Sequence, residues 1–119
     1  MEDYSFPKSL RLSGKKDIDA LFASGFSVMA YPFRLLSLRG DKPGILFSVP
    51  YRNFKKATDR NLVRRRMREA WRLNRHILGE TEPMMIAYIY TAKEILPYRT
   101  ISEKMIQSFR HLKRKNEKK

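Results

Sequence analysis

Residues 59–72 decide the fold, and they read DRNLVRRRMREAWR. At about 100° per residue, the apolar members of this stretch recur on one side of an α-helix. The same periodicity extends the helix to about 57–78, with Gly79 as its end. The stretch therefore predicts a long helix that buries one side against the rest of the domain. The residues expected on the buried side are Val63, Met67, Ala70, Trp71, Ile77 and Leu78.

A row of arginines, with one asparagine among them, lies beside that buried side. Like charges at i,i+4 destabilise a helix by about 0.2–0.5 kcal/mol per pair. Only Glu69, beside the row, offsets the repulsion between its arginines. Guanidinium groups bind phosphate oxygens bidentately and stack on bases. The row therefore indicates a surface for RNA or DNA; the alternative interpretation is a solvated basic face without a ligand. Its members are Arg60, Asn61, Arg64, Arg65, Arg68, Arg72 and Arg75.

The charge of the whole chain points the same way. The 119 residues include 26 Lys and Arg against 12 Asp and Glu, a formal net charge of +14. A polyanion would relieve the resulting self-repulsion, so nucleic acid is the first candidate and an anionic membrane surface the second. The absence of cysteine excludes disulfides and thiolate metal sites. Neither a signal peptide nor a membrane span is recognisable, so we expect a cytoplasmic, soluble protein.

Shorter elements flank the long helix. A first helix is expected between Ser13, as its N-cap, and Gly25, as the left-handed residue that ends it. Apolar stretches at 26–38 and 45–49 predict strands, the first of them divided at Pro32. A further strand is expected at 84–90.

A last helix completes the domain, with Thr100 and Glu103 as its capping box and with Ile101, Met105, Phe109 and Leu112 on its buried side. The order α-β-β-β-α-β-α predicts an α/β fold with one mixed sheet and helices packed on it. We expect residues 1–112 to form a single RNA-binding domain and residues 113–119 to form a basic, mobile tail.

Nothing in the sequence indicates a protein active site. His76 and His111 are isolated in basic segments and are expected at the surface. Asp17 and Asp19 fall about 200° apart on a helix, too divergent for a two-metal nuclease site. We therefore expect no catalytic residue and no metal ligand in the polypeptide.

Residues 60–69, RNLVRRRMRE, resemble the signature of the protein subunit of bacterial ribonuclease P, an Arg-Asn-Arg stretch that continues into a Lys/Arg-Arg-x-x-Arg helix. The resemblance extends over residues 6–12, 17–25, 33–38, 46–49 and 84–87. Two positions depart from the family pattern. Leu62 replaces the third residue of the Arg-Asn-Arg stretch, so one RNA contact is lost or passes to Arg64 or Arg66. Lys55 stands where many members have glycine, which changes the shape of that loop.

The resemblance implies a fold and a function. The implied fold is an α+β two-layer sandwich like domain 2 of ribosomal protein S5, with a left-handed crossover around the long helix. The implied function is that of the RNA-binding subunit of the ribonuclease P endoribonuclease, in which a catalytic RNA removes the 5′ leader from precursor tRNA. The protein would bind the leader and stabilise the holoenzyme. It would hold no cofactor itself, and Mg²⁺ would lie mainly at RNA phosphates.

The resemblance also assigns residues to two surfaces. A cleft between the sheet and the first helix would hold the single-stranded leader, whose bases can stack on apolar side chains at about 1–3 kcal/mol each. The alternative for Phe22 and Phe33 is an ordinary place in the core. The cleft would comprise Ile18, Phe22, Phe33, Leu36, Arg52 and Ile86. The catalytic RNA would contact Arg60, Asn61, Arg64, Arg65 and Arg68, with Arg72 added from the same row.

Two other classes of function remain open from the sequence. One is a ribosome-associated RNA-binding module without processing activity, and the other is a metal-dependent nuclease that acts alone. Precursor tRNA separates the three, because only the subunit requires both the protein and the catalytic RNA for cleavage.

Overall fold

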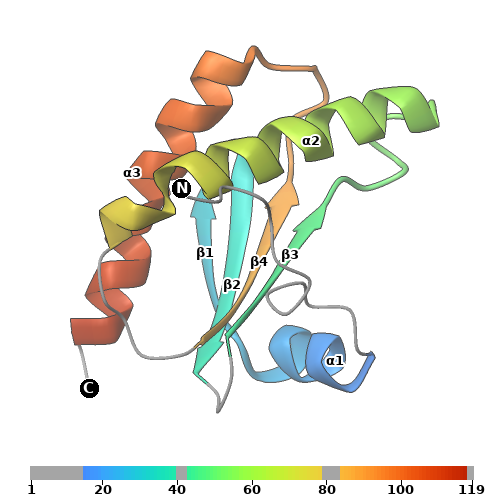
Figure 1. The fold of residues 1–119 in the computed structure, drawn as a ribbon. Helices are drawn as coiled ribbons and strands as arrows, with labels where there is room; N and C mark the ends of the chain where they lie inside the picture. The colour runs from blue at the N-terminus through green and yellow to red at the C-terminus, as the bar shows by residue number, and fades with distance from the viewer. Residues whose placement is uncertain (1–14, 40–42, 79–83, 118–119) are drawn as a thin grey trace, which may run out of the picture.

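The computed structural model describes residues 15–39, 43–78 and 84–117, and the side chains as far as Lys113 (Figure 1). The order α-β-β-β-α-β-α is confirmed. The elements are α1 (Lys15–Ser24), β1 (Phe26–Ala30), β2 (Phe33–Arg39), β3 (Gly44–Ser48), α2 (Ala57–Asn74), the 3-10 helix η2 (Arg75–Leu78), β4 (Met84–Tyr90) and α3 (Tyr98–Glu117).

The four strands form one mixed sheet in the order β1-β2-β4-β3. Strands β1, β2 and β4 are antiparallel neighbours, whereas β3 and β4 are parallel and are connected through α2. Figure 1 shows β3 and β4 pointing upward, α2 in front of the sheet and β4 to the left of β3. The crossover is therefore left-handed, as the resemblance implies, although nearly all such connections are right-handed.

Each face of the sheet carries a separate core. Helices α2 and α3 cover the face that presents Phe33, Tyr88 and Tyr90, which are fully buried beneath them. Helix α1 packs Leu21 against Leu36 on the opposite face, and this second core is much smaller. Because successive side chains of a strand point to opposite faces, β2 and β4 contribute to both cores. Among the described helices, α1 alone packs on this face, and it covers only part of it.

The buried side of α2 is largely as predicted. Val63 and Met67 are fully buried, and Ala70 and Trp71 lie in the same core. The predicted end of the helix is wrong, because α2 stops at Asn74 and the chain continues as η2. A 3-10 helix turns by about 120° per residue instead of 100°, which rotates Ile77 away from the buried side. Ile77 is consequently 38% exposed.

The end of α1 differs from the prediction in its cause. The Gly25 amide donates to the Leu21 carbonyl at 2.8 Å, and its φ lies outside the left-handed region. A Cβ at this position would lie 2.3 Å from the same carbonyl oxygen. Glycine is therefore required by close packing and not by a left-handed turn. The predicted cap, Ser13, lies outside the described residues.

The beginning of α3 also differs from the prediction. The helix starts at Tyr98, so Thr100 already lies inside its first turn, and Glu103 pairs with Arg99 at 3.2 Å. The capping box is therefore wrong. The buried side is confirmed, with Ile101, Met105, Phe109 and Leu112 all in the larger core. The helix continues to Glu117 and so includes most of the segment predicted as a tail.

Candidate nucleic-acid interface

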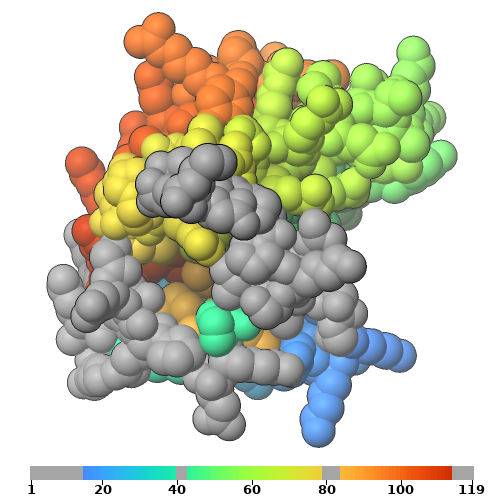
Figure 2. All heavy atoms as spheres, in the orientation of Figure 1, coloured from blue at the N-terminus to red at the C-terminus, as the bar shows by residue number. Residues whose placement is uncertain are grey.

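The outer side of α2 is the first basic surface. Figure 2 shows side chains of α2, coloured from green to yellow, across the upper part of this face of the molecule. Asn61 and Arg65 are exposed, and Arg64 and Arg68 are half-buried. The Arg64 guanidinium donates to the Asn61 amide oxygen at 2.9 Å, which holds both side chains on one patch. Four of the six predicted contacts with the catalytic RNA therefore share an accessible surface, which we call the outer α2 face (Asn61, Arg64, Arg65 and Arg68).

The remaining two predicted contacts are engaged within the protein. Arg60 donates from Nη1 to the backbone oxygens of Phe54 and Lys55, at 2.8 and 2.9 Å, and lies over the ring of Tyr51. Arg72 forms an ion pair with Glu69, one turn earlier on α2. An ion pair reduces the field that Arg72 presents to a polyanion. Arg60 and Arg72 therefore contribute less to a surface for RNA than helical periodicity suggested.

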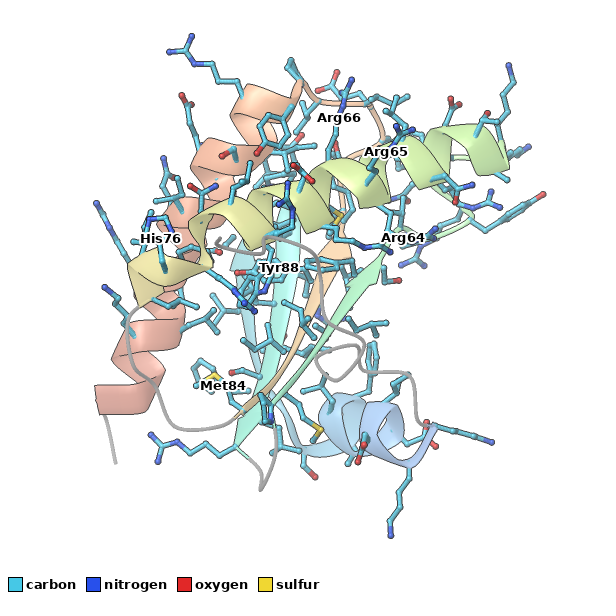
Figure 3. The ribbon with its side chains drawn as sticks, viewed as in Figure 1. Arg64, Arg65, Arg66, His76, Met84 and Tyr88 are labelled. Atoms are coloured by element: carbon cyan, nitrogen blue, oxygen red, sulfur yellow. The ribbon has the colours of Figure 1, made fainter. Side chains whose placement is uncertain are left out.

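Arg66 also turns inward, away from the outer α2 face. Its Nη1 donates to the Leu96 carbonyl at 2.7 Å, in the segment between β4 and α3. Figure 3 shows Arg64 and Arg66 leaving α2 on opposite sides. Arg66 does not belong to the row that helical periodicity defines, but its partner was not foreseeable from the helix alone.

The second basic surface lies on the face of the sheet that carries α1. Ile18 packs on the smaller core beside Leu36, which is buried. Phe22 lies one helical turn beyond Ile18 and is 50% exposed, so its ring is available at the side of α1. Three of the predicted cleft residues therefore come together on this face, with Phe22 as their accessible aromatic ring.

Two predicted cleft residues lie on the other face and are corrected. Phe33 and Ile86 are buried in the larger core beneath α2 and α3. Their strand neighbours Arg34 and Ala87 point to the α1 side, and the alternation of a strand then places Phe33 and Ile86 opposite. The apolar character of both residues fits either face, which is why the sequence did not separate them.

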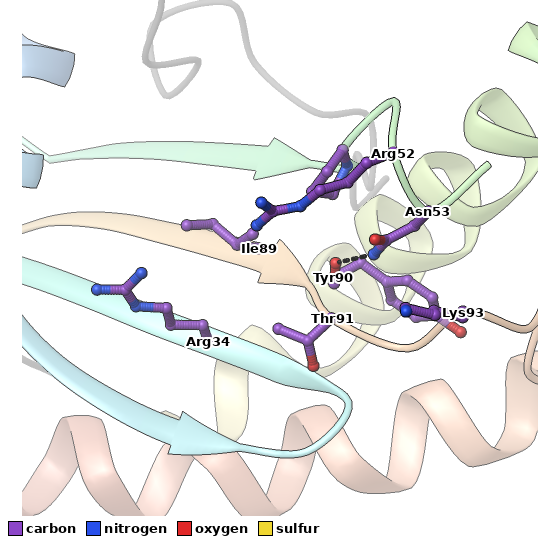
Figure 4. Close-up of a pocket in the computed structure, with 8 residues that line it drawn as sticks. Arg34, Arg52, Asn53, Ile89, Tyr90, Thr91 and Lys93 are labelled. Atoms are coloured by element: carbon purple, nitrogen blue, oxygen red, sulfur yellow. Dashed lines mark hydrogen bonds between the residues drawn. The ribbon is translucent and has the colours of Figure 1, made fainter. Parts of the chain in front are cut away.

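Beyond α1, the described residues of this face border a pocket of about 430 Å³. Figure 4 shows Arg34 and Arg52 extending on either side of Ile89, with Lys93 at the other end of the pocket. The three cations come from β2, from the loop after β3 and from the segment after β4. We call this site the cation pocket; it is lined by Arg34, Pro50, Arg52, Asn53, Ile89, Tyr90, Thr91 and Lys93.

Hydrogen bonds hold the walls of the cation pocket. The Asn53 amide donates to the backbone oxygens of Tyr90 and Ala92, at 3.0 and 3.3 Å, and joins the loop after β3 to the end of β4. Arg34 donates from Nε to the Ser27 hydroxyl at 3.2 Å on the neighbouring strand. The site combines positive charge with the apolar side chain of Ile89, which suits a phosphodiester chain carrying unpaired bases.

Of the residues that line the cation pocket, only Arg52 was predicted from the sequence to belong to a binding site. A signal for Arg34 existed, because a charged residue between Phe33 and Leu35 indicates a side chain on the opposite face of a strand. Asn53, Thr91 and Lys93 carried no such pattern. They belong to loops whose positions depend on contacts across the fold.

Metal and membrane signals are both missing from the part of the chain that the structure describes. No group of three or more His, Cys, Asp or Glu side chains is arranged there to hold a metal ion. Asp17 and Asp19 do not belong to any such group. Nor does any described helix have the length and apolar character that crossing a membrane requires.

Comparisons with known proteins point to one family. The family described as Ribonuclease P matches residues 6–114. The chain is 30% identical over 115 residues to the ribonuclease P protein component of Porphyromonas gingivalis, covering 88% of this chain and 84% of the relative. It is 28% identical over 89 residues to that of Nitrosococcus oceani, covering 73% and 75%.

Solved structures show the same architecture. The RNase P protein from Thermotoga maritima superposes with a TM-score of 0.72 at 25% identity, covering 85% of this chain and 96% of that one. The RNase P protein of Staphylococcus aureus gives a TM-score of 0.74 at 17% identity, covering 88% and 96%. The second likeness concerns the fold alone. Both agree with the predicted α/β class and with the mixed four-stranded sheet.

Proposed function

The chain belongs to the family of bacterial ribonuclease P protein components, and from this membership we propose that it binds the 5′ leader of precursor tRNA and stabilises the holoenzyme. As a member of that family it is a subunit of the ribonuclease P endoribonuclease and associates with the ribonuclease P RNA. Cleavage is assigned to the RNA, as the family resemblance implies, and the described residues hold no group of three or more His, Cys, Asp or Glu side chains that could bind a metal ion.

The outer α2 face is the proposed contact with the catalytic RNA. Asn61, Arg64, Arg65 and Arg68 present guanidinium groups and one amide on a single accessible side of a rigid helix. Such groups bind phosphate oxygens and position an RNA without reading its sequence. Arg72, paired with Glu69, would contribute a weaker attraction at the end of the same face.

The cation pocket carries the proposal for the leader. Arg34, Arg52 and Lys93 come from three separate segments to line one pocket, on the face of the sheet where Leu36 packs and where α1 contributes Ile18 and the half-exposed Phe22. A single-stranded leader could place phosphates near the cations and a base against Phe22. This convergence is the single observation that supports leader binding best.

Mg²⁺ is assigned to the RNA in this proposal. The described acidic residues do not form a site with several ligands, whereas RNA phosphates can supply oxygen ligands to Mg²⁺. The protein would instead lower the repulsion between leader and catalytic RNA, and so reduce the Mg²⁺ concentration that cleavage needs. The place of action is proposed to be the cytoplasm, with residues 1–112 as one RNA-binding domain and the basic end 113–119 as its extension.

Cleavage of precursor tRNA at low Mg²⁺ tests the function. The protein and the ribonuclease P RNA are each assayed alone and then together. Cleavage that needs both components supports the proposal. Cleavage by the protein alone would identify a nuclease, and RNA binding without any stimulation would identify a binding module; either result refutes it.

Phe22→Ala tests leader binding by comparing precursor tRNA with mature tRNA. Loss of a stacked base weakens binding by about 1–3 kcal/mol, so the holoenzyme should lose about fivefold or more of its preference for the leader-bearing substrate. Phe26→Ala is the matched control, because Phe26 is 48% exposed and its partner in β2 is Ser37, on the face opposite to Leu36. Equal effects of both variants would exclude Phe22 from the leader site.

A further inference from the structure

Two arginines of α2 point away from the outer α2 face and toward the loops that border the cation pocket. Arg60 reaches the loop between β3 and α2, and Arg66 reaches the segment between β4 and α3. Arg65, between them in sequence, is exposed. One helix thus presents arginines to solvent on one side and ties two loops with arginines on the other.

Arg60 fixes the loop that carries Arg52. Its Nη1 donates to two successive carbonyls, those of Phe54 and Lys55, while its guanidinium carbon lies 5.1 Å from the centre of the Tyr51 ring. The residue before the helix, Lys56, makes no capping hydrogen bond with its side chain. Arg60 therefore supplies a constraint at this end of α2 that a capping residue does not provide.

Arg66 fixes the segment that carries Lys93. Its hydrogen bond to the Leu96 carbonyl is short, at 2.7 Å, and a charged donor makes such a bond stronger than a neutral one. The Tyr90 hydroxyl holds the same segment from inside, since it donates to the Glu94 carbonyl and accepts from the Leu96 amide. Lys93 itself is exposed at the edge of the cation pocket.

We propose that Arg60 and Arg66 are positioning residues, which hold the two loops that place Arg52 and Lys93 around the cation pocket. The proposal rests on the proposed leader-binding role of that pocket. It assigns Arg60 to the leader side of the molecule, although its position in the arginine row suggested the catalytic RNA. The side of α2 that faces the two loops then supports the leader site at the cation pocket, and the outer α2 face forms the contact with the catalytic RNA.

Geometry, and not charge alone, is required of these two residues. Nη1 of Arg60 directs two N–H groups within the guanidinium plane toward adjacent carbonyls, and an ammonium group cannot reproduce that planar pair. Lysine at position 60 keeps the positive charge but not this pair of bonds. Lysine at position 66 keeps the charge but replaces the planar donor that reaches the Leu96 carbonyl with a compact ammonium group. The Arg→Lys variants therefore separate a positioning role from a purely electrostatic one.

The experiment measures two affinities for each variant. The first is that of the protein for ribonuclease P RNA; the second is the ratio of holoenzyme affinities for precursor and mature tRNA. Arg60→Ala, Arg60→Lys, Arg66→Ala and Arg66→Lys should each lower the ratio by about fivefold to tenfold. Their affinity for the catalytic RNA should fall no more than that of Arg110→Ala, which removes an exposed arginine of α3. Arg65→Ala should show the opposite pattern.

Three results bear directly on the proposal. A normal ratio in the lysine variants would show that charge suffices and would overturn it. Loss of catalytic-RNA affinity with an unchanged ratio, as expected for Arg65→Ala, would also overturn it. Arg52→Ala separates leader binding at the cation pocket from the positioning role of Arg60 and Arg66. If Arg52→Ala leaves the ratio unchanged, leader binding at the pocket is refuted. If it lowers the ratio while the Arg60 and Arg66 variants do not, only the positioning role is refuted.

Amide exchange provides a readout that does not depend on RNA. In Arg60→Lys, exchange should accelerate at residues 53–56, and in Arg66→Lys at residues 94–96, while β2 and β4 remain protected. Unaltered exchange at both loops would contradict the positioning role. Because the lysine variants retain the charge and the aliphatic part of the side chain, they serve the test even where an alanine variant fails to fold.

Discussion

At the scale of single residues, Tyr88 shows how the larger core accommodates a hydroxyl. The side chain is fully buried between aromatic rings, and its hydroxyl is 2.7 Å from that of Ser108. The Ser108 hydroxyl donates to the Met105 carbonyl, which leaves Tyr88 as the donor of the pair. Burial raises the pKa of the Tyr88 phenol well above its usual value, because the charged form would lose its hydration.

Tyr88→Phe is predicted to change the pH dependence of stability. Near neutral pH the variant should lose about 1 kcal/mol of the free energy of unfolding, the net value of one hydrogen bond. The unfolded phenol ionises near pH 10 and the folded one only at higher pH, so the wild type loses stability as the pH rises past about 10. The gap between wild type and variant should therefore narrow there.

Urea unfolding at about pH 8 and about pH 10.5 measures that gap, on either side of the ordinary tyrosine value. Tyr51→Phe is the control, because its ring is 65% exposed. A gap that stays constant across the two conditions would show that ionisation of Tyr88 does not couple to unfolding.

Individual residues mark how far the sequence could predict the site. Phe22 lies on α1 and is half-exposed, which argues against a place in the core, while its contact with the leader stays a prediction. Phe33 and Ile86 were not, because an apolar residue in a strand that is buried on both faces carries no sign of which face it serves. Arg60 was assigned by helical periodicity, which gives the direction of a side chain but not the loop that it meets.

At the scale of the element, α2 serves two purposes with one sequence. Its buried side is hydrophobic and was predictable from the period of 3.6 residues. Its end was less predictable, since the change to a 3-10 helix at Arg75 follows from packing against α3, where Asn74 donates to the Ser102 hydroxyl at 3.1 Å. The capping box of α3 is wrong because that helix begins earlier, where the Pro97 carbonyl accepts from the Ile101 amide.

Arg64→Ala combined with Arg65→Ala is predicted to weaken binding of the catalytic RNA and to flatten its salt dependence. Each phosphate contact contributes about 0.7–0.9 to the slope of log K against log salt, so the slope should fall by about one to two. Titrations at several salt concentrations measure it. Arg110→Ala with Lys113→Ala, which removes two exposed cations of α3, should leave the slope near the wild-type value. An unchanged slope in the α2 variant would exclude the outer α2 face.

At the scale of the whole molecule, charge opposes folding. A net charge of +14 lies within a radius of gyration of 13.8 Å, which is close to the screening length of about 10 Å at 0.1 M salt. Repulsion therefore acts across the entire protein at low ionic strength.

The isolated protein should accordingly become more stable as sodium chloride is added. Raising the salt from about 20 to about 500 mM should increase Tm by several degrees. Thermal unfolding followed by circular dichroism measures the change, and the Arg64→Ala, Arg65→Ala variant should gain less because it carries less charge. A Tm that falls with salt would mean that internal ion pairs outweigh the repulsion.

The order of elements could be predicted from the sequence, but the order of strands in the sheet could not. The pairing of β1 with β2 is local and follows from their succession in the chain. The position of β4 between β2 and β3 depends on contacts between residues far apart in sequence. The cation pocket depends on the same contacts, which is why its loops escaped prediction.

The late arrival of β4 has a consequence during synthesis on the ribosome. A nascent chain that ends before Met84 contains β2 and β3 but not the strand that joins them, so each has an open edge. Open edges of apolar strands invite pairing between chains. Helix α2 precedes β4, and its arginines already repel neighbouring copies at that moment. The arginines proposed to bind RNA in the folded protein thus also oppose association between nascent chains that still lack β4.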